Sequence, residues 1–250
     1  MSDTLDHGDV VHHFTARAGI YDRSSHWCTA EDLMAKVVDC AAPEAHHHLL
    51  DLACGTGLVT RAFSGRVARL VGLDLTPAMA AQAEAALDEL VIGQAESMPF
   101  ADASFDRVTC RQGIQFMDAP KAAAEIHRVL KPGGRVILID LAAYGEADRD
   151  EYFEVLRLRN PARRNFWVRG DVQKLLEDAG FSSVQTIEHV SIEDVDAWSA
   201  NGAISEVRRE GIRDVYRNAS EAFRSLHAVA TEDDTRFTDH VLFTITSGVR

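Results

Sequence analysis

The sequence predicts an α/β fold: a doubly wound, mostly parallel sheet of seven strands, with an antiparallel last strand and a helical cap. Short apolar runs alternate with helix-periodic stretches from residue 49 to residue 190, which is typical of βαβ units. A long charged, helix-periodic segment, 193–230, then precedes the final strand-like run His-Val-Leu-Phe-Thr-Ile-Thr. A strand that returns through such a long connection can pair antiparallel with its neighbour.

Each element follows from its local pattern. The expected strands are apolar runs bounded by turn residues, at 49–53, 68–74, 89–95, 105–110, 135–140, 183–190 and 239–247. The expected helices between them have small or apolar residues at helical spacing, at 58–63, 78–87, 120–130 and 171–179. Pro77 suits a first helical turn, and Lys-Pro-Gly-Gly at 131–134 ends a helix.

The chain is expected to form one domain over residues 1–250, because no repeat or linker divides it. Its core would comprise about 46–191 and 237–250. The helical segments 1–45 and 192–236 would form a cap over the ligand crevice, which in such folds lies beyond the carboxyl ends of the strands.

Composition restricts the partners. A net charge of -13 argues against binding to a phosphate backbone, and no stretch has the length and apolar character of a membrane span. The four cysteines form no Cys-x-x-Cys pair, and the N-terminus lacks a signal pattern, so we expect a cytoplasmic protein. A small-molecule substrate is expected, with no nucleic acid or membrane partner, for a monomer or homodimer.

The most informative segment is 51–57, Asp-Leu-Ala-Cys-Gly-Thr-Gly, which follows an apolar strand. Gly55 and Gly57 allow a sharp turn and a ligand against bare backbone, which suits a dinucleotide or S-adenosylmethionine. A dinucleotide fingerprint requires a third glycine where this chain has Thr60. The carboxylate of Asp51 also favours S-adenosylmethionine, and a nicotinamide-dependent oxidoreductase is the second hypothesis.

Several motifs in order resemble the class I S-adenosylmethionine-dependent methyltransferases, most closely the type 11 branch that includes ubiquinone and menaquinone biosynthesis enzymes. The resemblance extends over most of residues 14–140. The motifs are Phe14-x-x-Arg17-Ala18-x-x-Tyr21-Asp22, Asp51 to Gly57, Gly72-Leu73-Asp74-Leu75-Thr76-Pro77-x-Met79, Gly93-Gln94-Ala95-Glu96-x-x-Pro99-Phe100, Ser104-Phe105-Asp106 and Glu125-Ile126-x-Arg128-Val129-Leu130-Lys131-Pro132-Gly133-Gly134.

The resemblance implies how the cofactor would be held. The glycine loop would surround its methionine part, with Asp51 near the ammonium, and Asp74 would accept both ribose hydroxyls. Leu75 and Met79 would pack against adenine. The complete set of implied cofactor-binding residues is Tyr21, Asp51, Ala53, Gly55, Thr56, Gly57, Asp74, Leu75, Met79, Gln94, Ala95, Glu96, Arg111 and Gln112.

The chain departs from the family at the adenine edge and after the fourth strand. The family usually has Asp where this chain has Gln94, so either Gln94 or Glu96 is expected to contact the adenine amino group. Residues 111–115, Arg-Gln-Gly-Ile-Gln, replace a more apolar or histidine-containing stretch. Arg111 could be a salt-bridge partner or a substrate anchor. The expected substrate-binding residues are Gln115, Phe116 and Trp167.

Methyl transfer is an in-line displacement at an activated carbon, so the protein mainly aligns the reactants and excludes water. His12, His13 and His26 are the candidate bases. The run 46–48, three histidines entering a strand, is expected to be a solvated linker, and no metal site is expected. The favoured activity is methylation of O, N or C in a small apolar or aromatic metabolite. A methyltransferase-like fold recruited as a cyclase or partner-binding protein is a third hypothesis.

Overall fold

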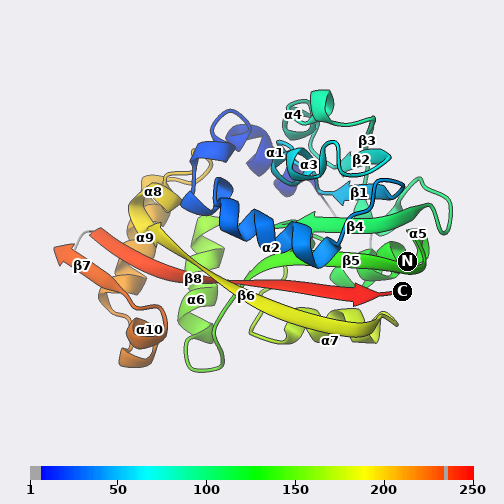
Figure 1. Cartoon of the computed structure of the whole chain (residues 1–250). Helices are drawn as coiled ribbons and strands as arrows, with labels where there is room; N and C mark the ends of the chain where they lie inside the picture. Colours follow the sequence, from blue (N-terminus) through cyan, green and yellow to red (C-terminus); the bar gives the residue numbers. More distant parts are fainter. Residues whose placement is uncertain (1–6, 234–235) are drawn as a thin grey trace, which may run out of the picture.

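The computed structural model describes residues 7–233 and 236–250, which form one sheet covered by helices (Figure 1). The sheet has eight strands in the order β3-β2-β1-β4-β5-β8-β6, with β7 paired to β8. The strands are β1 His48–Leu52, β2 Arg69–Asp74, β3 Glu89–Ile92, β4 Phe105–Arg111, β5 Leu130–Ala142, β6 Ser182–Asp194, β7 Ala230–Asp233 and β8 Arg236–Val249.

The topology confirms the predicted doubly wound sheet. Strands β1 to β5 pair in parallel, and β8 pairs antiparallel with both β5 and β6. The prediction of seven strands was short by one, because β7 lies inside the segment expected to be helical. This strand has only four residues, and their sequence, Ala-Thr-Glu-Asp, offers no apolar run to detect.

The helices differ from expectation at two places. The helix after Pro77 ends at Ala80 instead of continuing to residue 87, because the chain turns there and packs Ala83 on the glycine loop. Helix α6 was not predicted, since its sequence is strongly charged. The helices are α1 Gly8–Arg17, α2 Glu31–Ala41, α3 Leu58–Phe63, α4 Pro77–Ala80, α5 Ala119–Val129, α6 Arg149–Arg159, α7 Asp171–Asp178, α8 Val195–Ser199, α9 Glu206–Arg217 and α10 Glu221–Leu226.

Two hydrophobic cores lie on the two faces of the sheet, as the alternation of strand side chains requires. Leu49 belongs to the core under α2, α3, α6 and α9, whereas its neighbour Leu50 belongs to the core under α5 and α7. Cys54 and Cys110 are buried, and all four cysteines are free. The two cores fix the strands rigidly, so the loops at their carboxyl ends have a stable support.

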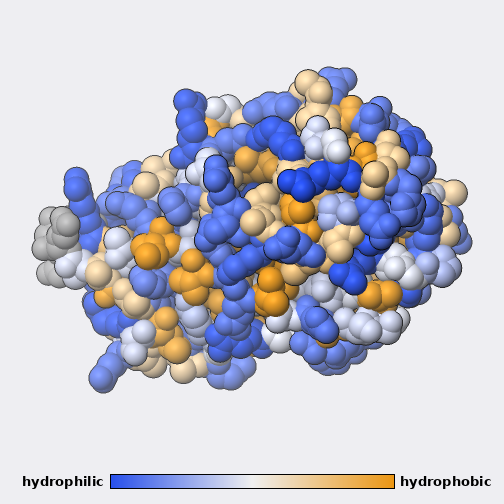
Figure 2. Space-filling view, in the orientation of Figure 1, coloured by the Kyte–Doolittle hydropathy of each residue, from blue (hydrophilic) through white to orange (hydrophobic). Residues whose placement is uncertain are grey.

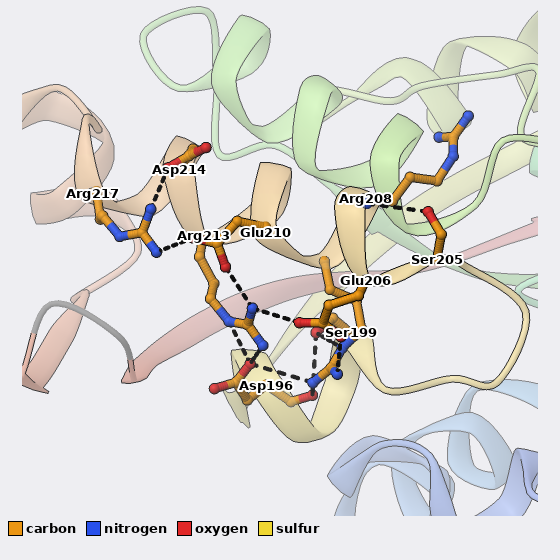
Figure 3. Close-up of polar contacts among 10 residues, drawn as sticks. Asp196, Ser199, Ser205, Glu206, Arg208, Glu210, Arg213, Asp214 and Arg217 are labelled. Carbon is orange, nitrogen blue, oxygen red and sulfur yellow. Dashed lines mark hydrogen bonds and ion pairs between the residues drawn. The ribbon is translucent and has the colours of Figure 1, made fainter.

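The two expected cap segments take different positions. Helix α1 lies beside α4 at the carboxyl ends of β1 and β2, whereas α2 buries its apolar side chains in the core. Helices α8, α9 and α10 gather around the ends of β6, β7 and β8 (Figure 1). An ion-pair network holds α9 to α8, with Arg213 bonded to Asp196, Glu206 and Glu210 (Figure 3). The second cap segment therefore packs against one end of the sheet.

The outer surface is mainly hydrophilic on the face shown in Figure 2, where hydrophobic side chains form separate patches. Apolar side chains exposed on the edge strand β6 are Ile187, Val190 and Ile192. Among the described residues, no helix combines the length and apolarity that crossing a membrane requires.

Candidate functional site

The glycine loop begins where β1 ends and has a strained backbone that only small residues tolerate. Ala53, Gly55 and Gly57 all have positive φ, at 55°, 53° and 84°. A Cβ on Gly57 would lie 3.0 Å from the Cβ of Ala83 and 3.1 Å from its Cα. Glycine is therefore required at position 57 for two reasons: its backbone conformation and the close approach of the chain after α4.

Asp74 ends β2 and faces the same loop. Its Oδ2 accepts the N–H of Gly55 at 2.8 Å, and its Oδ1 accepts the N–H of Thr76 at 2.7 Å. Burial raises the pKa of this carboxyl, and these backbone N–H groups oppose the rise. Each carboxylate oxygen has two lone pairs, so each can accept another hydrogen bond from a ligand in the pocket.

Asp51 lies deeper, at the base of the loop, and is 1% exposed. It accepts hydrogen bonds from the hydroxyls of Thr60 at 2.6 Å and Thr109 at 3.1 Å. Burial raises the pKa of Asp51 to about 6, although these hydrogen bonds lower it. Thr60, which replaces the third glycine of a dinucleotide loop, therefore orients a buried carboxylate that would favour a cation nearby.

A pocket of about 860 Å³, including space open to solvent, joins the glycine loop to the ends of β2, β3 and β4. This volume is within the range of small-molecule sites. It brings together every predicted cofactor-binding residue except Gly57, which precedes α3 at the end of the loop. The predicted residues that line it are Tyr21, Asp51, Ala53, Gly55, Thr56, Asp74, Leu75, Met79, Gln94, Ala95, Glu96, Arg111 and Gln112.

The two candidates for the adenine edge have different surroundings. Glu96 Oε1 accepts the N–H of Asp118, at the start of α5, at 2.9 Å. Its other oxygen, Oε2, lies 3.9 Å from His7 Nε2. Gln94 is exposed at the pocket wall. Glu96 therefore has one oxygen engaged by the backbone, whereas Gln94 has the more accessible side chain and is the stronger candidate for a ligand contact.

The N-terminal segment closes the pocket from above. Asp22 accepts hydrogen bonds from the Thr56 hydroxyl and, at 3.1 Å, from Arg61 Nη2. Gln82 Nε2 donates to the carbonyl oxygen of Ala18 at 2.7 Å. These contacts attach the segment to the glycine loop and to the chain after α4, so Phe14 and Tyr21 become walls of the pocket.

A second cavity of about 320 Å³, including space open to solvent, adjoins the first and shares Phe14, Tyr21, Gln112 and Phe116 with it. Gln115, predicted to contact substrate, lines this cavity and donates to Gln112 Oε1 at 3.2 Å. The structure places the predicted Gln115 and Phe116 together beside the cofactor pocket, which suits a substrate position.

Besides Gly57, four predicted residues lie outside both cavities. Trp167 is 8% exposed and packs in the core under α5 and α7. His12 is exposed, and the Nδ1 of the exposed His26 lies 3.4 Å from the Ser191 hydroxyl. His13 is buried, and burial together with Arg17 and Arg159 lowers its pKa to about 3, which makes it a poor proton acceptor. The structure therefore supports none of the three histidines as the base.

The expected solvated linker is also different in the structure, because His47 is 6% exposed and its Nδ1 accepts the N–H of Glu44 at 3.0 Å. Side-chain atoms of Glu44, His46 and His47 lie within 4.8 Å of one another. One of these histidine nitrogens is already bonded to backbone, so the cluster is explained as a turn that precedes β1.

The sequence interpretation did not assign His7, Val10, Phe14, Thr76 or Met117 to the site, yet all five line the larger pocket. Phe14 belonged to a recognised motif and could have been assigned. Val10 lies four residues before Phe14 on the same face of α1, and that helical spacing was the available signal for it. His7 and Met117 carried no signal, since their positions depend on how the segments pack.

The fold and this site resemble those of Rossmann-like methyltransferases, which are enzymes. Residues 50–138 match the family described as "Methyltransferase domain". The sequence prediction of a type 11 methyltransferase domain is confirmed.

Similar sequences and a solved structure are also methyltransferases or related to them by name or fold. The chain is 37% identical over 160 residues to the uncharacterized methyltransferase YcgJ of Bacillus subtilis, covering 60% of this chain and 62% of the relative. It is 37% identical over 145 residues to the ubiquinone/menaquinone biosynthesis C-methyltransferase UbiE of Paracoccus denitrificans, covering 50% and 58%. The crystal structure of the B. subtilis YcgJ protein has a TM-score of 0.80 at 25% identity and covers 87% of this chain and 97% of that one. In the sequence alignments, the chain thus spans less than two thirds of the length of these two relatives.

Proposed function

We propose that the protein is an S-adenosylmethionine-dependent methyltransferase that acts on O, N or C of a small metabolite with an apolar or aromatic body. The observation that carries this proposal is the placement of Asp74, whose carboxylate lines a pocket bounded by the glycine loop and is held there by two backbone N–H groups. A vicinal diol is the ligand group that two adjacent acceptor oxygens match best.

The residues present fit this cofactor. Asp51 is a buried carboxylate beside the loop, and a neighbouring cation would stabilise its ionised form. Met79 is 3% exposed and, with Leu75, supplies an apolar wall for a flat ring. Gln94 offers an amide oxygen at the edge of that wall. A ribose, an adenine and a positively charged amino-acid part would each meet suitable groups.

When bound, S-adenosylmethionine would supply a methyl carbon that its sulfonium already activates. The protein then has to orient the nucleophile and exclude water. Phe14 and Phe116 pack edge to face, with ring centres 5.0 Å apart, and line both cavities, where they would help to exclude water. Burial raises the pKa of Tyr21, so its hydroxyl stays protonated and can donate a hydrogen bond to a substrate between the two cavities.

The proposal is tested by incubating the protein with methyl-deuterated S-adenosylmethionine and a mixture of small metabolites. Mass spectrometry should detect S-adenosylhomocysteine together with a product that carries the labelled methyl group. A parallel titration compares S-adenosylhomocysteine with NADH and NADPH. Tighter binding of a nicotinamide cofactor would favour an oxidoreductase. Cofactor binding without any labelled product would favour a fold recruited as a cyclase or partner-binding protein.

A further inference from the structure

We infer that the substrate carries an anionic group, a carboxylate or phosphate, held by buried arginines in the cavity beside the cofactor pocket. This inference rests on the proposed function, because it names the class of substrate for the same site. The arginines are Arg17 of α1, Arg159 at the end of α6, and Arg163 just after it, and all three line the second cavity. Arg111, at the end of β4, lines the adjoining cofactor pocket.

These side chains are buried as cations without anionic partners. Arg17, Arg111, Arg159 and Arg163 are only 2%, 8%, 6% and 9% exposed. Within the described ranges 7–233 and 236–250, none of the four forms an ion pair with a carboxylate. The arginines of α9 differ, since Arg213 and Arg217 each pair with at least two carboxylates (Figure 3). Arg209 also pairs with two, Asp196 and Glu206. In a protein with a net charge of -13, carboxylates are abundant, and they are kept away from this cavity.

The groups that do contact these arginines are neutral. Arg159 donates to the Trp198 carbonyl oxygen and the Ser25 hydroxyl, both at 3.2 Å. Arg17 donates to the Ser24 hydroxyl at 3.3 Å, and its Nε has no partner. Guanidinium carbons lie over aromatic rings, 4.3 Å from the Trp198 centre for Arg159 and 4.8 Å from the Tyr21 centre for Arg17. Such contacts hold the side chains in place but leave their charge uncompensated.

The nearest carboxylates do not supply that compensation. Neither carboxylate oxygen of Asp140 hydrogen-bonds to its neighbour Arg163 or to any other described group, and burial raises the pKa of Asp140 to about 8. The charge of Glu193 acts to raise the pKa of Arg159, but the Glu193 oxygens accept hydrogen bonds from the N–H groups of His26 and Trp27, at 2.9 and 3.0 Å. Burial lowers the pKa of Arg159 to about 9 and that of Arg163 to about 10, and both remain charged near neutral pH.

The cofactor has one carboxylate of its own, which could neutralise one of the four cations. It would still leave Arg159 and Arg163, which line only the second cavity, without an anionic partner. An unpaired buried cation is costly, whereas a guanidinium bonded to a carboxylate or phosphate gains charge-assisted hydrogen bonds. The anion of a substrate placed against the aromatic wall formed by Phe14 and Phe116 would provide that partner.

The test uses the full chain saturated with S-adenosylhomocysteine. Calorimetry at constant ionic strength compares benzoate and phenyl phosphate with benzyl alcohol and benzylamine. We expect at least one of the two anions to bind about tenfold or more tightly than the neutral and cationic compounds. Equal binding of the anions and benzyl alcohol, or no binding of either anion, would overturn the inference.

Single substitutions of arginines test which side chain binds the anion. Arg159→Gln should weaken anion binding about tenfold or more, while Arg157→Gln, on the same helix but 53% exposed at its side chain, should leave it unchanged. Arg159→Lys keeps the charge and should fall between them, which preserves the test if the Gln variant does not fold. An Arg159→Gln variant that binds the anions as wild type does would contradict the inference.

The affinity for S-adenosylhomocysteine distinguishes a failure of this inference from a failure of the proposed function. It should be unchanged in Arg159→Gln and Arg163→Gln. If both variants lose cofactor affinity, and the saturated wild type binds no anion, the cofactor's own carboxylate occupies the cluster and the inference is wrong. If the wild type does not bind the cofactor at all, the proposed function fails, and the same anion titration on the free protein still tests the arginine cluster.

Discussion

The carboxylate of Asp74 accepts a hydrogen bond from the backbone N–H of Gly55 at 2.8 Å, so the end of β2 holds the glycine loop that follows β1. The two strands are neighbours in the sheet, with Leu52 opposite Leu73. One carboxylate therefore has two functions: it fixes the loop and it presents acceptor oxygens to the pocket. This shared position is the structural basis of the proposed cofactor site.

The conformation of the glycine loop leads to a prediction for Gly57→Ala. The new methyl group would lie 3.0 Å from the Cβ of Ala83. In addition, an alanine with a φ of 84° would destabilise the folded state by about 1–2 kcal/mol. We expect a lower melting temperature and at least about tenfold weaker binding of S-adenosylhomocysteine, because the loop must shift. Differential scanning calorimetry and isothermal titration would measure the two effects.

Gly65→Ala is the matched control for this substitution. Gly65 also has a positive φ, at 72°, but nothing lies within 4 Å of the position of its Cβ. This variant should lose stability from backbone strain alone and keep its cofactor affinity. Equal cofactor affinity in the two variants would mean that close packing at Gly57 does not shape the site.

The adenine edge provides a second prediction. Gln94→Ala should weaken binding of S-adenosylhomocysteine about threefold to tenfold, which corresponds to one lost neutral hydrogen bond. Glu96→Gln should instead lower stability, because it weakens the acceptor for the N–H of Asp118 at the start of α5. Titration and thermal unfolding of both variants decide between the two residues. A larger loss of affinity in Glu96→Gln than in Gln94→Ala would reverse the assignment.

A buried histidine between two carboxylates predicts a pH dependence of stability. His227 is 0% exposed, with Nδ1 2.7 Å from Asp239 Oδ1 and Nε2 3.0 Å from Asp148 Oδ2. Burial by itself lowers the pKa of His227, but hydrogen bonds to Asp148 and Asp239 outweigh it and raise the pKa to about 9. Because the folded pKa exceeds the unfolded one, this contribution to stability is fully present below about pH 6.5 and is lost as pH rises through about 9.

The measurement is the free energy of unfolding in urea at several pH values between 6 and 10. Wild type should lose stability over this range more steeply than His227→Gln, which should be less stable at pH 6. His240→Gln, a half-buried neighbour in β8, is the control and should follow wild type. Parallel pH profiles for wild type and His227→Gln would show that the ion-paired histidine makes no pH-dependent contribution.

Local patterns carried most of the information about the fold. The strand at Leu49 and Leu50 was predictable because its residues are apolar on both faces, as a central parallel strand requires. Helix α6 was missed because charged residues mask its buried positions, such as Tyr152 and Leu156. Strand β7 was missed because its pairing with β8 is decided by tertiary contacts.

The lining of the pocket was predictable where a sharp turn or a strand end favours a particular residue type, as with Gly55 and Asp74. Residues that only form walls, such as His7, reach the pocket through packing that no local pattern encodes. Trp167 shows the opposite error, since an aromatic residue near a predicted site is equally suited to a core. The arginine cluster could not be predicted from the sequence, because its members come from distant segments. Only the structure shows that they lie together without carboxylate partners.

The central claim is most directly tested by isothermal titration of S-adenosylhomocysteine into wild type, Asp74→Asn and Glu84→Gln. Glu84 is an exposed acid outside the pocket, so its variant controls for the loss of one negative charge. Wild type and Glu84→Gln should bind equally well, and Asp74→Asn should bind about a hundredfold more weakly, since two charge-assisted hydrogen bonds become neutral ones. Equal affinity in Asp74→Asn and wild type would contradict the claim that this carboxylate and the glycine loop form a methyl-donor site.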